Sequence, residues 1–167
     1  MEEALRVWIA AIESRYARDG EWIPWADAWI LKLDEPPLWL LHVCVEQSSR
    51  EALSVLYPGL AYSWKEWSDP LDWIRLRLGF YYLAHERDQS DLHALFVKVF
   101  EIAENCNTIE AEVSELLKLW REVGERPAFV PGYRSLAERV AEAFKPFSDL
   151  ARLKWSRLHD ELPQIQL

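Results

Sequence analysis

Residues 21–41 read EWIPWADAWILKLDEPPLWLL and hold four tryptophans and three prolines in one short stretch. Pro24 stands where a helix can begin, because the first helical position needs no N–H donor. From Pro24 onward, apolar residues recur at spacings of three and four, which is typical of one helical face. Pro36 and Pro37 end this pattern, because residues that precede proline avoid helical geometry. The stretch therefore predicts two helices separated by a proline break.

The second of these helices, expected from about Pro37 to Glu46, is apolar on nearly every side. Such a pattern is typical of a central, enclosed helix. Trp25 and Trp29 lie one turn apart on the preceding helix and are predicted to pack beside it. Trp39 is predicted to be in the core, whereas the position of Trp22 is left open.

The same 3.6-residue rhythm continues through the rest of the chain. Ser48 and Glu51 have capping-box spacing, and Asp69-Pro70 is a strong helix start. Pro146 either kinks one long helix or divides it in two. We therefore expect an all-α fold, an irregular antiparallel bundle or short helical array of about eight helices, forming one domain over residues 1–167. The expected segments are 2–18, 24–33, 37–46, 49–57, 70–87, a helix capped by Asp88 or Ser90 that ends at 105–107, a helix capped by Thr108 that ends before Gly124, and 135–162.

The composition excludes several classes of protein. The net charge is −9, from 28 acids against 19 bases, whereas nucleic-acid binding draws on basic residues that neutralise phosphates. No apolar run approaches the length of a membrane span, and the N-terminal residues do not resemble a signal peptide. Cys44 and Cys106 match no zinc or redox spacing. These features predict a soluble, cytoplasmic protein that binds neither nucleic acid nor membrane.

No catalytic motif, phosphate-binding loop or metal-ligand spacing is present in the sequence. His85, Asp88, Asp91 and His93 fall near one interhelical corner, where they are either a weak divalent site or a solvated, capped junction. We favour the junction, because metal sites need converging ligands. We therefore predict no catalytic residue, no cofactor and no metal.

Charge is unevenly distributed along the chain. Residues 86–115 hold eight acids and two bases, a net charge of −6, and residues 134–157 hold six bases and three acids, a net charge of +3. Either these two regions meet each other, or the acidic face steers a basic partner.

The chain contains ten tryptophans, which is more than core filling requires. Those on apolar stripes are predicted to be core: Trp8, Trp25, Trp29, Trp73 and Trp120. Trp64 and Trp67, with Tyr62, crowd one short segment between helices, and Trp155 lies among charges. Exposed aromatic residues of this kind anchor interfaces, but they also cover the open ends of helical arrays.

A resemblance to a known group of proteins is carried by two sequence patterns, the first made of Trp22, Trp25, Ala26, Asp27 and Ile30 and the second of Pro36, Pro37, Trp39 and Leu40. The chain resembles small bacterial all-helical domains of unknown function, some of which are similar to immunity proteins that neutralise secreted toxins. The resemblance covers the first third of the chain and implies binding through a variable surface, with no catalytic residues.

Three hypotheses for function follow. The leading one is an immunity-like protein-binding domain that captures a basic toxin through an acidic face with aromatic anchors. The second is a ligand-binding or enzymatic domain whose pocket is bordered by Tyr81, Tyr82 and His85. The third is a homo-oligomer formed through the segment 62–67. The partner-binding residues predicted under the first hypothesis are Glu101, Glu104, Glu112, Glu115, Trp64 and Trp67.

Overall fold

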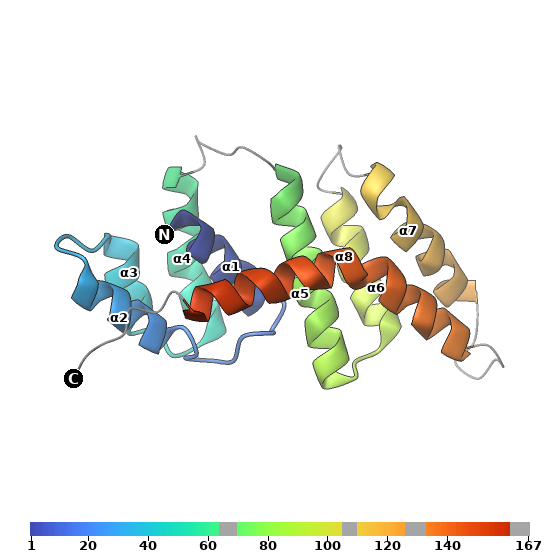
Figure 1. The fold of residues 1–167 in the computed structure, drawn as a ribbon, viewed down its shortest axis with the longest axis horizontal. Helices are drawn as coiled ribbons and strands as arrows, with labels where there is room; N and C mark the ends of the chain where they lie inside the picture. Colours follow the sequence, from blue (N-terminus) through green and yellow to red (C-terminus); the bar gives the residue numbers. More distant parts are fainter. Residues whose placement is uncertain (64–69, 105–109, 126–132, 161–167) are drawn as a thin grey trace. The chain divides into compact units, whose positions relative to one another are not determined.

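The computed structural model describes residues 1–63, 70–104, 110–125 and 133–160, and the side chains of residues 1–60, 71–104, 113–122 and 136–160 (Figure 1). These residues form eight helices and no strand, which confirms the predicted all-α fold. The chain divides into two compact units: Met1–Pro70 together with Ala151–Leu167, and Leu71–Leu150. The single domain expected over residues 1–167 stays a prediction.

The first unit contains four helices and the end of a fifth. These are α1 (Glu2–Glu13), α2 (Ile23–Lys32), α3 (Leu38–Val43), α4 (Ser49–Ser63) and the part of α8 (Tyr133–Asp160) that follows Leu150. Helix α1 is the core element, with seven of its twelve residues buried. It packs against α4, and α3 packs against both α2 and α4 (Figure 1).

Helix α1 ends five residues earlier than the sequence predicted. Arg15 has a φ of 63°, in the left-handed region that terminates helices. The buried Ser14 hydroxyl donates to the Ala11 carbonyl at 3.0 Å. Apolar spacing alone extended the expected helix to residue 18, because Tyr16 continues the stripe in sequence.

Trp22, whose position the sequence left open, is 1% exposed. Its indole N–H donates to the carbonyl oxygens of Val43 at 3.1 Å and Glu46 at 3.0 Å. Val43 is the last residue of α3, and Glu46 lies three residues beyond it. Trp22 therefore fixes the C-terminal end of α3 to the start of α2.

The indoles of the first unit pack on one another. Trp8 lies 5.8 Å from Trp25 and 5.1 Å from Trp155 between ring centroids, and Tyr16 lies 5.4 Å from Trp155. Trp155, which the sequence placed among charges, is thus part of an aromatic cluster. Its packing partners come from α1, which is distant in sequence and was not foreseen.

Helix α4 begins with two side-chain caps. The predicted capping box is present in one half, since the Glu51 N–H donates to the Ser48 hydroxyl at 3.3 Å, and the Glu51 carboxylate accepts from that same hydroxyl at 2.6 Å. Asp19 adds a second cap by accepting from the Ser49 hydroxyl and from the Ser49 N–H at 2.9 Å, and these two hydrogen bonds lower the pKa of Asp19. The predicted end at 57–59 is wrong: the helix continues through Pro58 to Ser63, with Leu56 and Leu60 both buried.

The second unit contains α5 (Pro70–Asp88), α6 (Leu92–Glu104), α7 (Glu110–Glu125) and α8 as far as Leu150. Its core centres on Phe144, whose ring stacks on Tyr82 at 4.7 Å and meets the rings of Phe96 and Phe147 at 6.2 and 6.3 Å. Helix α5 begins at Pro70 as predicted.

Two helix boundaries in the second unit differ from expectation. The cap of α6 is Asp91, whose carboxylate accepts from the His93 N–H at 3.1 Å, and not Asp88 or Ser90. Helix α7 passes through Gly124 instead of ending before it.

Pro146 lies inside α8, which runs from Tyr133 to Asp160 as one helix.

Candidate functional site

An open, mostly apolar groove of about 620 Å³ lies between helices α3 and α4 of the first unit. From α3 and its start it is lined by Pro37, Leu38, Trp39 and His42. From α4 it is lined by Ser54, Val55, Pro58 and Gly59. Because most of this lining is hydrocarbon or aromatic, the groove favours apolar side chains over polar ligands.

The groove depends on a glycine in α4. A Cβ atom added at Gly59 would lie 2.9 Å from Cγ of Trp39 and 3.1 Å from its Cδ1. Only a residue without a side chain therefore lets the Trp39 indole lie directly against the α4 backbone. The sequence offered no signal for this contact, since a Pro-Gly pair reads as a helix end.

Pro58 leaves a polar group in the lining. Proline has no N–H, so the carbonyl of Ser54, four residues earlier, loses its normal helical donor. Ser54 is exposed and lines the groove. The groove lining therefore combines mostly apolar side chains with two polar residues, Ser54 and His42.

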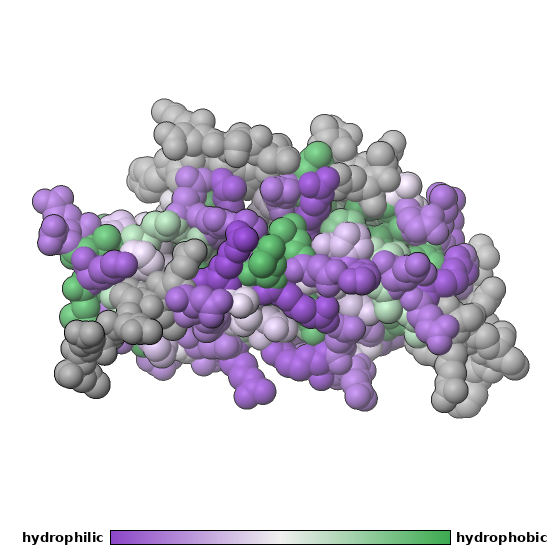
Figure 2. Space-filling model, viewed as in Figure 1, coloured by the Kyte–Doolittle hydropathy of each residue, from purple (hydrophilic) through white to green (hydrophobic). Residues whose placement is uncertain are grey.

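Helix α3 is not the enclosed helix that its sequence predicted. Leu38 is 67% exposed and Leu41 is 40% exposed, and Val45, just beyond the helix, is 67% exposed. The helix has only six residues and buries two of them, Leu40 and Val43. It packs against α2 and α4 and has no further neighbour among the described helices that covers its outer side. Figure 2 shows hydrophobic side chains at the surface in the region of α2 and α3, beside hydrophilic ones.

Acidic residues outnumber basic ones in the segment that contains α3 and the start of α4. Residues 34–51 hold Asp34, Glu35, Glu46 and Glu51 against Arg50, a net charge of −3. This segment contains all of α3 and the first turn of α4. The lining itself holds no acidic residue, but the segment that contributes its α3 side is net negative, which favours a basic partner.

Of the predicted acidic-face residues, three can be placed. Glu101 and Glu104 lie on α6 and Glu115 on the adjacent α7, and all three are exposed. Glu101 pairs with Lys98 at 2.7 Å and Glu115 with Lys118 at 3.1 Å. These pairs offset part of the charge that the sequence assigned to this face. The side chain of Glu112, together with Trp64 and Trp67, lies outside the described residues.

The basic segment, residues 134–157, forms ion pairs with Glu122 and Glu3, which are not among the predicted partner-binding acids. Arg139 of α8 forms two hydrogen bonds of 2.8 Å with the Glu122 carboxylate of α7, and this pairing raises the pKa of Arg139. In the first unit, Lys154 pairs with Glu3, which lowers the pKa of Glu3. Lys145 of the same segment pairs with Asp149, four residues along α8, at 2.6 Å.

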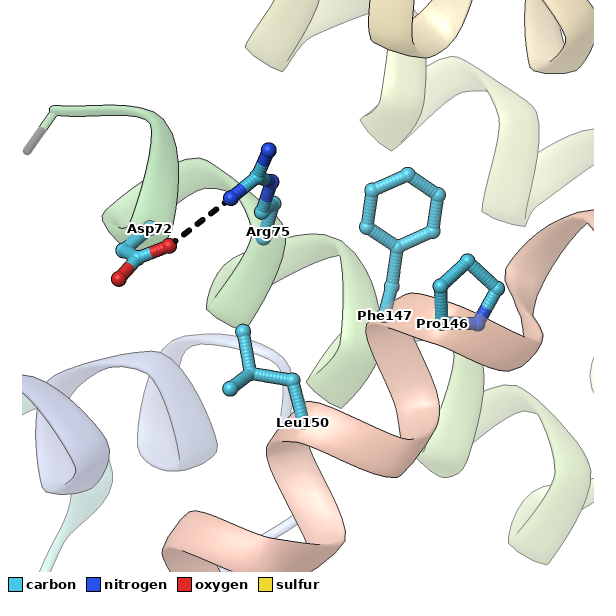
Figure 3. A pocket seen from close by; sticks show the side chains of 5 residues that line it. All are labelled: Asp72, Arg75, Pro146, Phe147 and Leu150. Atoms are coloured by element: carbon cyan, nitrogen blue, oxygen red, sulfur yellow. Dashed lines mark hydrogen bonds and ion pairs between the residues drawn. The ribbon is translucent and has the colours of Figure 1, made fainter.

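A second hollow of about 470 Å³ lies in the second unit between α5 and α8 (Figure 3). Asp72 and Arg75 of α5 form an ion pair of 3.1 Å at one side, and Figure 3 shows Phe147 extending from α8 towards α5. The lining also includes Pro146 and Leu150. Because Asp72 and Arg75 already pair with each other, this hollow is a weaker site for a charged ligand than its two charged residues suggest.

The pocket residues expected under the ligand-binding hypothesis do not line this hollow or the α3–α4 groove. Tyr82 is buried in the core against Phe144, and Tyr81 and His85 are half-buried. Burial lowers the pKa of His85, with Glu86 and Asp91 opposing the effect. Tyr82 therefore belongs to the core of the second unit.

The corner at His85, Asp88, Asp91 and His93 is occupied by local contacts. His85 Nδ1 lies 3.0 Å from the Ser90 hydroxyl, and Asp88 pairs with Arg87. His93 packs on Trp120 with the ring centroids 4.9 Å apart. No group of three metal-ligating side chains comes together within the described residues.

The two remaining observations concern cysteine and membranes. The Cys44 thiol donates to the Leu41 carbonyl at 3.0 Å, and burial together with Asp27 raises its pKa, which disfavours the reactive thiolate. In the part of the chain that the structure covers, no helix is both long and apolar enough to cross a bilayer.

Comparisons with known proteins give no further guide to the site. No family model matches the sequence, and neither the curated proteins nor the solved structures contain a significant match. The site must therefore be interpreted from its own geometry.

Proposed function

We propose that this chain is a protein-binding domain that engages an apolar segment of a basic partner through the groove between α3 and α4. The observation that carries the proposal is the exposure of Leu38 beside a groove of about 620 Å³. A large apolar surface of this kind marks an interaction site in a soluble protein.

The acidic composition supports a basic partner. The whole chain carries a net charge of −9, and residues 34–51 carry −3. Charge of this sign accelerates the encounter with a basic protein and disfavours acidic competitors. In the more specific form implied by the resemblance to immunity proteins, the partner is a basic toxin that binding neutralises.

Site-specific photo-cross-linking tests the proposal. A benzophenone amino acid is introduced at Leu38 in the groove, at Glu104 on the acidic face, or at Leu153, an exposed position on α8. We expect one basic protein to be cross-linked from position 38, and the adduct at position 153 to be at least about tenfold weaker, because only position 38 lies in the interface.

The three positions separate the alternatives. An adduct formed from position 104 and not from position 38 would place the interface on α6 and contradict the role of the groove. The absence of a specific protein adduct at both positions would contradict a protein-binding function for these two surfaces.

A further inference from the structure

We infer that the occupant of the α3–α4 groove is an amphipathic helix that carries a basic residue beside its apolar anchors. This inference rests on the proposed protein-binding function and specifies the partner. Three observations support it: the helical walls of the groove, the carbonyl of Ser54 and the net negative charge of residues 34–51.

The walls favour a helix over an extended segment. An extended peptide leaves its own N–H and C=O groups unpaired unless a sheet edge receives them, and the described residues contain no strand. A helix satisfies its backbone internally and presents only side chains. A groove between two helices, lined by Leu38, Trp39 and Val55, suits such a face.

The size of the groove fits several side chains together. At about 620 Å³ it lies within the range in which proteins enclose drug-sized molecules. A single leucine would leave most of this space to water. Apolar residues spaced three and four apart on one helix fill it with one continuous face.

The basic residue follows from two groups in the lining. The Ser54 carbonyl has lost the N–H that Pro58 cannot supply, and it can accept from a lysine or arginine. Trp39 is half-buried and offers an indole to a cation at the same groove. The net charge of −3 over residues 34–51 attracts the same residue type.

A designed peptide provides the probe. It has about 18 residues, with leucines at spacings of three and four on one face and alanine and lysine elsewhere, which is long enough to form a helix. The matched control peptide has the same composition in a scrambled order without an apolar face. Fluorescence anisotropy of the labelled peptides measures binding to the full chain, and circular dichroism measures the helix that forms.

Two matched variants separate groove docking from simple charge attraction. Leu38 in the groove is 67% exposed, and Leu31, outside the lining, is 74% exposed. We expect Leu38→Asp to weaken binding of the amphipathic peptide about tenfold, because one apolar contact is lost. We expect Leu31→Asp to leave binding unchanged within about twofold. Both variants should fold, since both positions are exposed.

The results that would overturn the inference are distinct. Equal binding of the scrambled peptide, or tighter binding to both aspartate variants, would show that charge alone drives association. Sedimentation that shows a dimer of the chain, dissociated by Leu38→Asp, would make a second copy the occupant. If either result were found together with a cross-linked protein at position 38, the inference of a helical occupant would be wrong, but the proposed protein-binding function would stand. If no protein were cross-linked at position 38, both the helical occupant and protein binding through the groove would be contradicted.

Discussion

Replacing Trp22 with alanine is expected to lower the free energy of unfolding by about 3–5 kcal/mol, the usual cost of deleting a buried aromatic side chain. Trp22 is 1% exposed and donates to two carbonyls at the end of α3. Trp22→Phe keeps most of the ring but removes the indole N–H that both carbonyls accept from, and the Val43 carbonyl keeps its bond from the Glu46 N–H at 3.2 Å. The expected cost of Trp22→Phe is about 1–3 kcal/mol. Urea denaturation followed by circular dichroism measures both values.

Trp29→Phe is the matched control for Trp22→Phe. Trp29 lies two turns along the same helix and is half-buried. We expect this variant to cost less than Trp22→Phe, because less of the side chain is enclosed. A change of less than about 0.5 kcal/mol for Trp22→Phe, the range typical of surface substitutions, would contradict the anchoring role of its N–H.

The second large effect is expected at Gly59. In Gly59→Ala the new methyl group would meet Trp39 at 2.9 Å, so the indole must move. Overpacking of this kind costs about 1–3 kcal/mol, and the higher helix propensity of alanine offsets about 0.5–1 kcal/mol of it. We expect a net loss of stability, together with weaker binding of the amphipathic peptide, because the displaced indole fills the groove.

A double-mutant cycle isolates the contact. If the methyl group clashes with Trp39, Gly59→Ala should be tolerated once Trp39→Ala has removed the indole, and its cost should fall by about 0.5–3 kcal/mol in that background. Equal costs of Gly59→Ala in both backgrounds would show that Trp39 does not pack on α4 as the structure places it.

The sequence predicted the presence of the helices more successfully than their ends and the contacts between them. Periodicity and capping signals located the eight helices of the described residues, and Ser48 caps the Glu51 N–H as its spacing predicted. The ends depended on contacts that are distant in sequence. Pro58 reads as a stop signal, yet α4 continues past it because the apolar stripe resumes at the buried Leu60.

The candidate site could not be predicted for a similar reason. A helix that is apolar on every side is normally enclosed, but α3 is too short and has too few neighbours to bury Leu38 and Leu41. The groove arises where Gly59 admits Trp39, and a one-dimensional pattern does not record that contact. The acidic stretch was visible in the sequence, whereas the lysines that pair with Glu101 and Glu115 became apparent only in the structure.

The central claim is that the α3–α4 groove, and not the acidic face of α6 and α7, receives the partner. Titration of the ¹⁵N-labelled chain with the amphipathic peptide tests it most directly. The account predicts that amide shifts concentrate at Leu38–His42 and at Ser54–Gly59. Shifts concentrated instead around Glu101, Glu104 and Glu115, with the groove residues unchanged, would contradict it.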